Sequence, residues 1–226
     1  MKVILPIKSG RRWVPIAASD YATSLQAAEL VAGCRLKNLA NIIEPLITEH
    51  TLGRMDEPTT RLRIKAALTS NGKLPYFEIK GVRQELDTEW LDLVVRTNTS
   101  FTCGYHSFAQ SIDPETLDAY PARELVHVKG GTEPYDWKSR WTAAGGKLFG
   151  DRMIALKSNP VWLKISDFGH PHPPFAFDSG MDMVDVSRVE AVELGLTNWR
   201  SEIKVPPCPI CDDGSNSGNG DGGPAN

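Results

Sequence analysis

One stretch of the chain decides the fold, VRQELDTEWLDLVVRTNTSFTCGYHSFAQ at residues 82–110. Its apolar residues recur at the 3.6-residue spacing of a helix that buries one face. We therefore expect one long helix at the centre of the protein. Directly after it, Asp113 and Pro114 are typical of the N-cap and first position of another, short helix. The residues of the apolar stripe are Leu86, Trp90, Leu93, Val94, Phe101 and Phe108.

Before this helix the pattern predicts an extended arm and further helices. Residues 1–15 carry four basic residues and two prolines, which favours an arm with at most one short strand. A helix is expected from about residue 20 to 46, with a kink or break at Pro45. A short helix over residues 61–68 and a brief strand over 74–79 follow.

After Pro121 the sequence changes in character. Residues 124–128 read as a strand, and Asp136 is placed to cap a helix. The stretch 151–185 is rich in Pro, Gly and Phe, and we expect irregular loops there. Ser187–Glu190 fits the capping box of a last helix, which Gly195 would end.

These elements predict an α+β protein. Its helix-rich part, with the long central helix, is expected over residues 16–120. A small, aromatic-rich, irregular α+β lobe follows over 121–205, and we expect most of its aromatic rings to form a core rather than an exposed anchor for a partner. The tail, 206–226, is rich in Gly, Asp and Asn, and is expected to be disordered because it has little apolar surface to bury.

The composition argues against a membrane-spanning protein, and the charge is unevenly distributed along the chain. The chain has 226 residues, a net charge of -3 and a mean hydropathy of -0.28. It contains no run of eighteen apolar residues, so we expect a soluble globular protein without a membrane span. Residues 1–83 carry 13 Lys and Arg against 7 Asp and Glu, whereas the rest carries 12 against 21.

The positive half has two interpretations. It is either a solvated surface with uneven charge, or a face for nucleic acid or an acidic partner. The candidate contacts to DNA or protein are Arg61, Arg63 and Lys65.

Metal and nucleophile patterns are weak in this chain. His170 and His172, with Cys208 and Cys211, have the residue types of a two-His, two-Cys zinc site. However, the two halves are far apart in sequence and unlike a compact finger. Ordinary loop histidines and a tail C-x-x-C are the alternative, and we expect neither a metal nor another cofactor.

A set of short motifs resembles the bacteriophage minor head proteins, the Mu-like head-morphogenesis family, in a prophage-borne branch. The first is Arg96, Thr97 and Asn98 in the long helix. The others lie in the lobe and include a D-W-x-x-R-W segment, a P-P-F segment and an S-G-M segment. Their residues are Trp137, Arg140, Trp141, Pro174, Phe175, Gly180 and Met181.

The resemblance implies a structural protein of virion assembly. Such a protein associates with the portal vertex and other head proteins, and is packaged inside the head in few copies. It would meet its partners in the bacterial cytoplasm during assembly, and double-stranded DNA is a possible further partner. The motif residues would then serve the fold or contact a partner, without a catalytic role. Two alternatives stay open, a phage-encoded hydrolase or transferase and a small zinc-binding interaction module.

Overall fold

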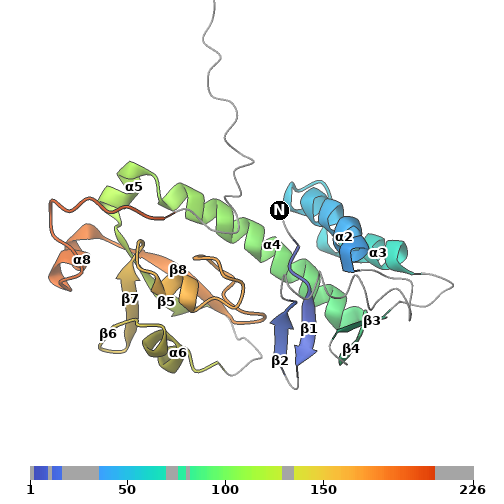
Figure 1. The fold of residues 1–226 in the computed structure, drawn as a ribbon. Helices are drawn as coiled ribbons and strands as arrows, with labels where there is room; N and C mark the ends of the chain where they lie inside the picture. Colours follow the sequence, from blue (N-terminus) through green and yellow to red (C-terminus); the bar gives the residue numbers. More distant parts are fainter. Residues whose placement is uncertain are drawn as a thin grey trace, which may run out of the picture.

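The computed structural model describes residues 3–9, 12–16, 36–69, 76–79, 82–128 and 135–206. These form an α+β protein, as the sequence predicts, in which α4 runs between a helical part and a sheet-based lobe (Figure 1). In chain order the elements are β1 (Pro6–Ser9), β2 (Arg12–Pro15), α2 (Leu36–Thr51), α3 (Glu57–Leu68), β3 (Tyr76–Ile79), β4 (Val82–Glu85), α4 (Thr88–Ser111), α5 (Pro114–Ala119), β5 (Ala122–His127), α6 (Trp137–Ala143), β6 (Leu148–Phe149), β7 (Arg152–Leu156), α7 (Val161–Lys164), β8 (Met181–Val186) and α8 (Arg188–Glu193).

The long central helix is confirmed as α4, but it begins later than the apolar pattern predicts. Residues 82–85 instead form β4, which pairs antiparallel with β3. The helix starts where the Asp87 side chain accepts the backbone N–H of Trp90 at 2.8 Å. Trp90 and Val94 are fully buried against α2 and α3, so the first half of the predicted stripe lies in the core of the helical part. Phe101 and Phe108, in its second half, pack against His170 and His172 of the lobe.

The first residues are not a free arm. β1 and β2 form an antiparallel hairpin, with Ile7 opposite Val14. Leu5 and Trp13 are buried in the same core as α4, and the Trp90 indole N–H donates to the Pro6 carbonyl at 2.9 Å. The alternation of apolar and polar residues over this short segment is what packs one face of the hairpin inward.

Asn98 holds this hairpin on α4. Its Oδ1 accepts the Ile4 N–H at 2.7 Å, and its Nδ2 donates to the Ile4 carbonyl at 2.9 Å and to the Val94 carbonyl at 2.8 Å. Asn98 is fully buried. One side chain therefore does for Ile4 what a neighbouring strand would do, by satisfying both of its backbone groups.

The lobe is built on a four-stranded antiparallel sheet in the order β6-β7-β5-β8 (Figure 1). Residues 151–185 thus contain β7, α7 and β8, and the expectation of irregular loops there is wrong. Pro and Gly lie in the connections between these elements, and Met153 and Ala155 of β7 are buried on one face in the alternation of a strand. Trp137, Trp141 and Trp162 pack on that face, so the aromatic residues are core, as predicted.

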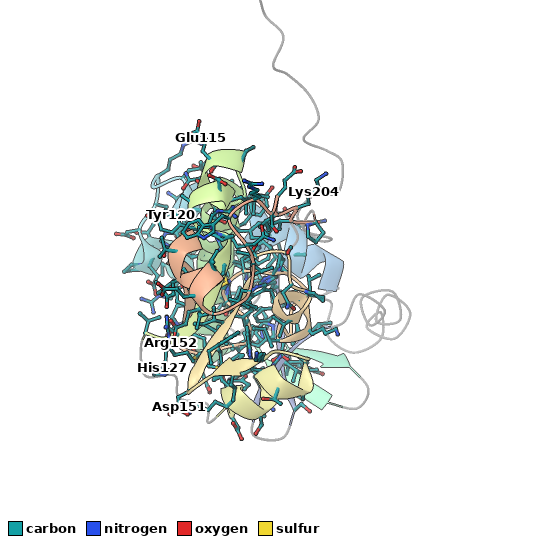
Figure 2. All side chains as sticks on the ribbon, turned by 90° about the vertical axis from the view of Figure 1, so that its left-hand side faces the viewer. Glu115, Tyr120, His127, Asp151, Arg152 and Lys204 are labelled. Atoms are coloured by element: carbon teal, nitrogen blue, oxygen red, sulfur yellow. The ribbon has the colours of Figure 1, made fainter. Side chains whose placement is uncertain are left out.

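The opposite face of the sheet carries α8. Ala122, Ile154 and Val186 form a second small core there with Ala191. At the exposed edge of this layer, the Arg152 guanidinium lies 2.6 Å from a carboxylate oxygen of Glu124 and 2.6 Å from one of Glu190, and Figure 2 labels this side chain. The lobe therefore has three layers, α6 and α7, the sheet, and α8.

Several helix ends agree with the capping residues, and others do not. Asp113, Asp136 and Ser187 cap α5, α6 and α8 as predicted. Pro45 lies inside α2, where its ring is exposed, so it neither ends nor interrupts the helix. The helix predicted over 61–68 begins earlier, at Glu57, because Asp56 caps it by accepting the Thr59 N–H.

Some expectations lie outside the described residues. They are the first part of the predicted helix from residue 20 and nearly all of the tail with its two cysteines. Among the helices that are described, none is both long and apolar enough to cross a membrane.

Replacing Asn98 by Leu is expected to lower the free energy of unfolding by about 2–4 kcal/mol, because the buried backbone groups of Ile4 lose their partners. Urea unfolding of the full chain measures this. The matched control is Gln110→Leu, an exposed amide on the same helix, which we expect to change stability by no more than about 0.5 kcal/mol. An unchanged unfolding midpoint for Asn98→Leu would contradict the role of Asn98 in holding the hairpin on α4.

Candidate functional site

A groove of about 860 Å³ runs along α4, between this helix and the lobe. Short side chains of α4 line one wall, among them Ser100, Cys103 and Ser107. The loop 173–180 and β8 line the other wall. The two walls are more than sixty residues apart in sequence, so only the packing of the lobe against α4 creates this site.

An ion pair spans the groove at one end. A guanidinium nitrogen of Arg96 lies 3.1 Å from a carboxylate oxygen of Asp178. Asp178 has a left-handed backbone (φ 48°), as does Gly180 (φ 63°), in the turn that leads into β8. Because the Arg96 side chain is about half exposed, we assign the pair a positioning role and little stabilisation.

A second charged cluster closes the other end, and sequence analysis missed it. Asp185 of β8 lies 3.1 Å from the Arg123 guanidinium and 3.0 Å from the Lys157 ammonium. Lys157 also donates to the carbonyl of Ser111, the last residue of α4, at 3.1 Å. Burial lowers the pKa of both Arg123 and Lys157. The strand register brings these residues together, and no local motif marks them.

The motif residues of the predicted resemblance divide into two sets. Arg96, Thr97, Pro174, Gly180 and Met181 line the groove. The others serve the fold: Asn98 holds the hairpin, and the remaining four lie in or beside the aromatic core of the lobe.

That aromatic core is closely packed. The ring centroids of Trp141 and Trp162 are 5.1 Å apart, and those of Trp162 and Phe175 are 6.3 Å apart. Arg140 lies 5.1 Å from the ring of Trp137 and forms an ion pair with Asp167 at 2.7 Å. Trp137, Arg140, Trp141 and Phe175 therefore stabilise the lobe and do not reach the groove.

His170 and His172 are fully buried and stacked on each other, with ring centroids 4.2 Å apart. Nδ1 of His170 lies 2.7 Å from the His172 carbonyl, and Nδ1 of His172 lies 2.9 Å from the Pro173 carbonyl. Both Nδ1 atoms therefore carry a proton, as donors to carbonyls. Phe101 and Phe168 pack against the His170 ring.

This environment bears on the zinc prediction. Burial, and then the charge of His172, lowers the pKa of His170 to about 3, so the ring is neutral at pH 7. The residues that the structure describes contain no group of three or more side chains suited to hold a metal. Cys208 and Cys211 lie outside those residues, so a site that includes them stays a prediction.

The three basic residues of α3 have different environments. Arg61 lies 2.7 Å from Asp92 of α4 and 3.8 Å from Glu57, so it joins the two helices. Arg63 and Lys65 are exposed, and neither has an ion pair within the described residues. Leu62 beside them is 66% exposed. Among the described residues of α3, Arg63 and Lys65 are therefore the exposed cations that no ion pair occupies.

Asp185→Asn is expected to lower the free energy of unfolding by about 2–4 kcal/mol, because Arg123 and Lys157 are left as buried cations without a counter-charge. The matched control is Glu193→Gln at the end of α8, where the side chain is exposed and outside any described ion pair. We expect the control to stay within about 0.5 kcal/mol of the wild type. Thermal or urea unfolding of both variants would decide this, and equal effects would refute the role of the cluster.

His170 predicts an acid-sensitive fold. Its pKa is about 3 in the folded state against an ordinary value of 6.5, so the unfolded chain takes up the proton first. The stability that depends on the neutral ring is complete above pH 6.5 and is lost as the pH falls toward 3. Between pH 6.5 and 4.5 we expect the wild type to lose about 1 kcal/mol per pH unit more than His170→Phe.

Urea unfolding at a series of pH values measures this difference. The capping carboxylates with lowered pKa, such as Asp56 and Asp113, have an ordinary value of 3.8, so they add little to the slope in that window. Parallel pH profiles for the wild type and His170→Phe would contradict the prediction.

No family model, curated protein or solved structure matches this chain. The resemblance to phage minor head proteins therefore stays a prediction from short, dispersed motifs. What the structure adds is the place of their residues, around one groove and one aromatic core.

Proposed function

We propose that this protein is a structural protein of bacteriophage virion assembly, a minor head protein that associates with the portal vertex. The Arg96–Asp178 ion pair carries the proposal. It joins Arg96 of the long helix to the turn between the P-P-F and S-G-M segments of the lobe, 82 residues further along the sequence. Residues of a shared family motif are expected to converge in this way when they form a unit.

The roles of the motif residues support an assembly function. Asn98 is fully buried and holds the hairpin on α4, and Trp141 is fully buried in the core of the lobe. Five other motif residues line an open groove, in which Asp178 and Asp185 are held in ion pairs. Such a surface suits the binding of another protein through packing and hydrogen bonds.

The exposed basic face of α3 is the proposed contact to the portal or to packaged DNA. Arg63 and Lys65 are the residues that test it, since Arg61 also holds α3 on α4. If DNA is bound there, the affinity falls steeply with salt, because phosphate contacts release counterions.

Two observations test the function. Genes for a terminase and a portal immediately upstream of this gene are expected, and flanking genes of metabolism or of a toxin–immunity pair would argue against the proposal. Mass spectrometry of purified particles from the induced prophage is then expected to find the chain in few copies. Its absence from intact particles would refute a virion role.

The double variant Arg63→Glu, Lys65→Glu is expected to lose co-purification with the portal protein or retention on double-stranded DNA while the chain stays folded. Its matched control is Arg200→Glu, Lys204→Glu, two exposed cations of the lobe, which should bind as the wild type does. If the α3 variant keeps both associations, the contact lies elsewhere.

A further inference from the structure

The outer edge of β8 has no strand beside it within the described residues. The sheet order β6-β7-β5-β8 places β8 at one end, paired only with β5. An edge strand presents a row of backbone N–H and C=O groups that can pair with another extended chain.

The register shows which groups of β8 face outward. The Val128 N–H donates to the Gly180 carbonyl at 2.9 Å, and these residues are directly opposite each other when the β5–β8 register is continued. Hydrogen-bonded and non-hydrogen-bonded pairs alternate along an antiparallel ladder. The backbone groups of Met181, Met183 and Asp185 therefore point away from β5.

The same three residues line the groove. Asp182, on the other face of the pleat, lines it too, so the edge of the strand and not one face opens into the groove. The Met183 N–H is occupied by the carboxylate of Asp182 at 2.8 Å, and the Met181 N–H by the Ser179 hydroxyl at 3.4 Å. Both N–H groups thus bond to a side chain one or two residues away in sequence. Carbonyls of an added strand would lie at the same positions and replace these side chains.

The opposite wall limits what can enter. α4 closes that side, with short side chains at Ser100, Cys103 and Ser107 facing the space. The backbone edge of β8 on one wall and these small side chains on the other suit a single extended segment. The occupant that fits is one extended segment.

We propose that an extended segment of a partner protein adds to the outer edge of β8 as a fifth strand, between β8 and α4. Met181 and Met183 lie on one face of the pleat, so the segment carries apolar residues at alternate positions. Asp182 is exposed and has no cation within ion-pair distance in the described part of the chain, so a Lys or Arg of the segment pairs with it. The inference does not depend on the phage assignment.

Cys103, an exposed free cysteine in the groove wall, offers a direct test. The other cysteines are replaced (Cys34→Ser, Cys208→Ser, Cys211→Ser), and the synthetic peptide CGGTVKVTV is joined to Cys103 of the full chain by a disulfide. Tethering gives the peptide a high effective concentration, so a weak preference suffices. Hydrogen exchange of single amides is then followed by NMR.

Once the peptide is attached, we expect hydrogen exchange of the Asp185 amide to slow by at least about tenfold, because this amide gains a hydrogen bond to the added strand. The amides of Asp182 and Val184 face β5 and should change little. The matched control carries the same peptide on Ala109→Cys with Cys103→Ser, an exposed position of α4 away from the groove, and should leave Asp185 unchanged.

Three outcomes would overturn the proposal. The Asp185 amide exchanges at the same rate with and without the peptide, or it slows equally in the Ala109→Cys control. The third is slow exchange of Asp185 without peptide that grows with protein concentration, together with a dimer in analytical ultracentrifugation. In that case a second copy of the chain, and not a partner segment, occupies the edge.

Discussion

The contact between Asn98 and the backbone of Ile4 is the constraint on which the rest of the structure depends. α4 touches both halves of the protein, and its first half must keep the N-terminal hairpin in place to complete the core around Trp90. A buried amide that satisfies both backbone groups of a residue some ninety positions away tolerates little displacement. The hairpin therefore sets how α2, α3 and α4 pack, and leaves the far face of α4 for the lobe.

The lobe meets that far face through charged contacts at two ends. Arg96 and Asp178 join them at one end, and Lys157 joins the sheet to the Ser111 carbonyl at the other. Between these ends Phe101 of α4 packs against His170, and the short side chains of Ser100, Cys103 and Ser107 leave the space beside β8 unfilled, which forms the groove. The same arrangement supports the proposed assembly role and the proposed strand addition, since both need a stable frame with an accessible surface.

Much of the fold follows from local chemistry. Asp113, Asp136 and Ser187 begin helices because their side chains accept N–H groups of the first turn, and the apolar stripe of α4 becomes core. The predictions that are wrong are those in which tertiary contacts overrule local signals. β7 and β8 lie in a stretch whose Pro and Gly suggested loops, and α2 continues through Pro45 while Ile43 and Ile47 on either side of it are fully buried in the core.

The sequence by itself determined the fold class, the central helix, the caps and the aromatic core, because spacing and capping act over a few residues. The tertiary structure was needed to show that Asn98 holds the hairpin on α4, that Arg61 forms an ion pair with Asp92, and that Asp185 faces two buried cations. The groove, too, could not be predicted from the sequence, since its walls are brought together by sheet register and helix packing. Those depend on contacts between distant residues, which no local pattern encodes.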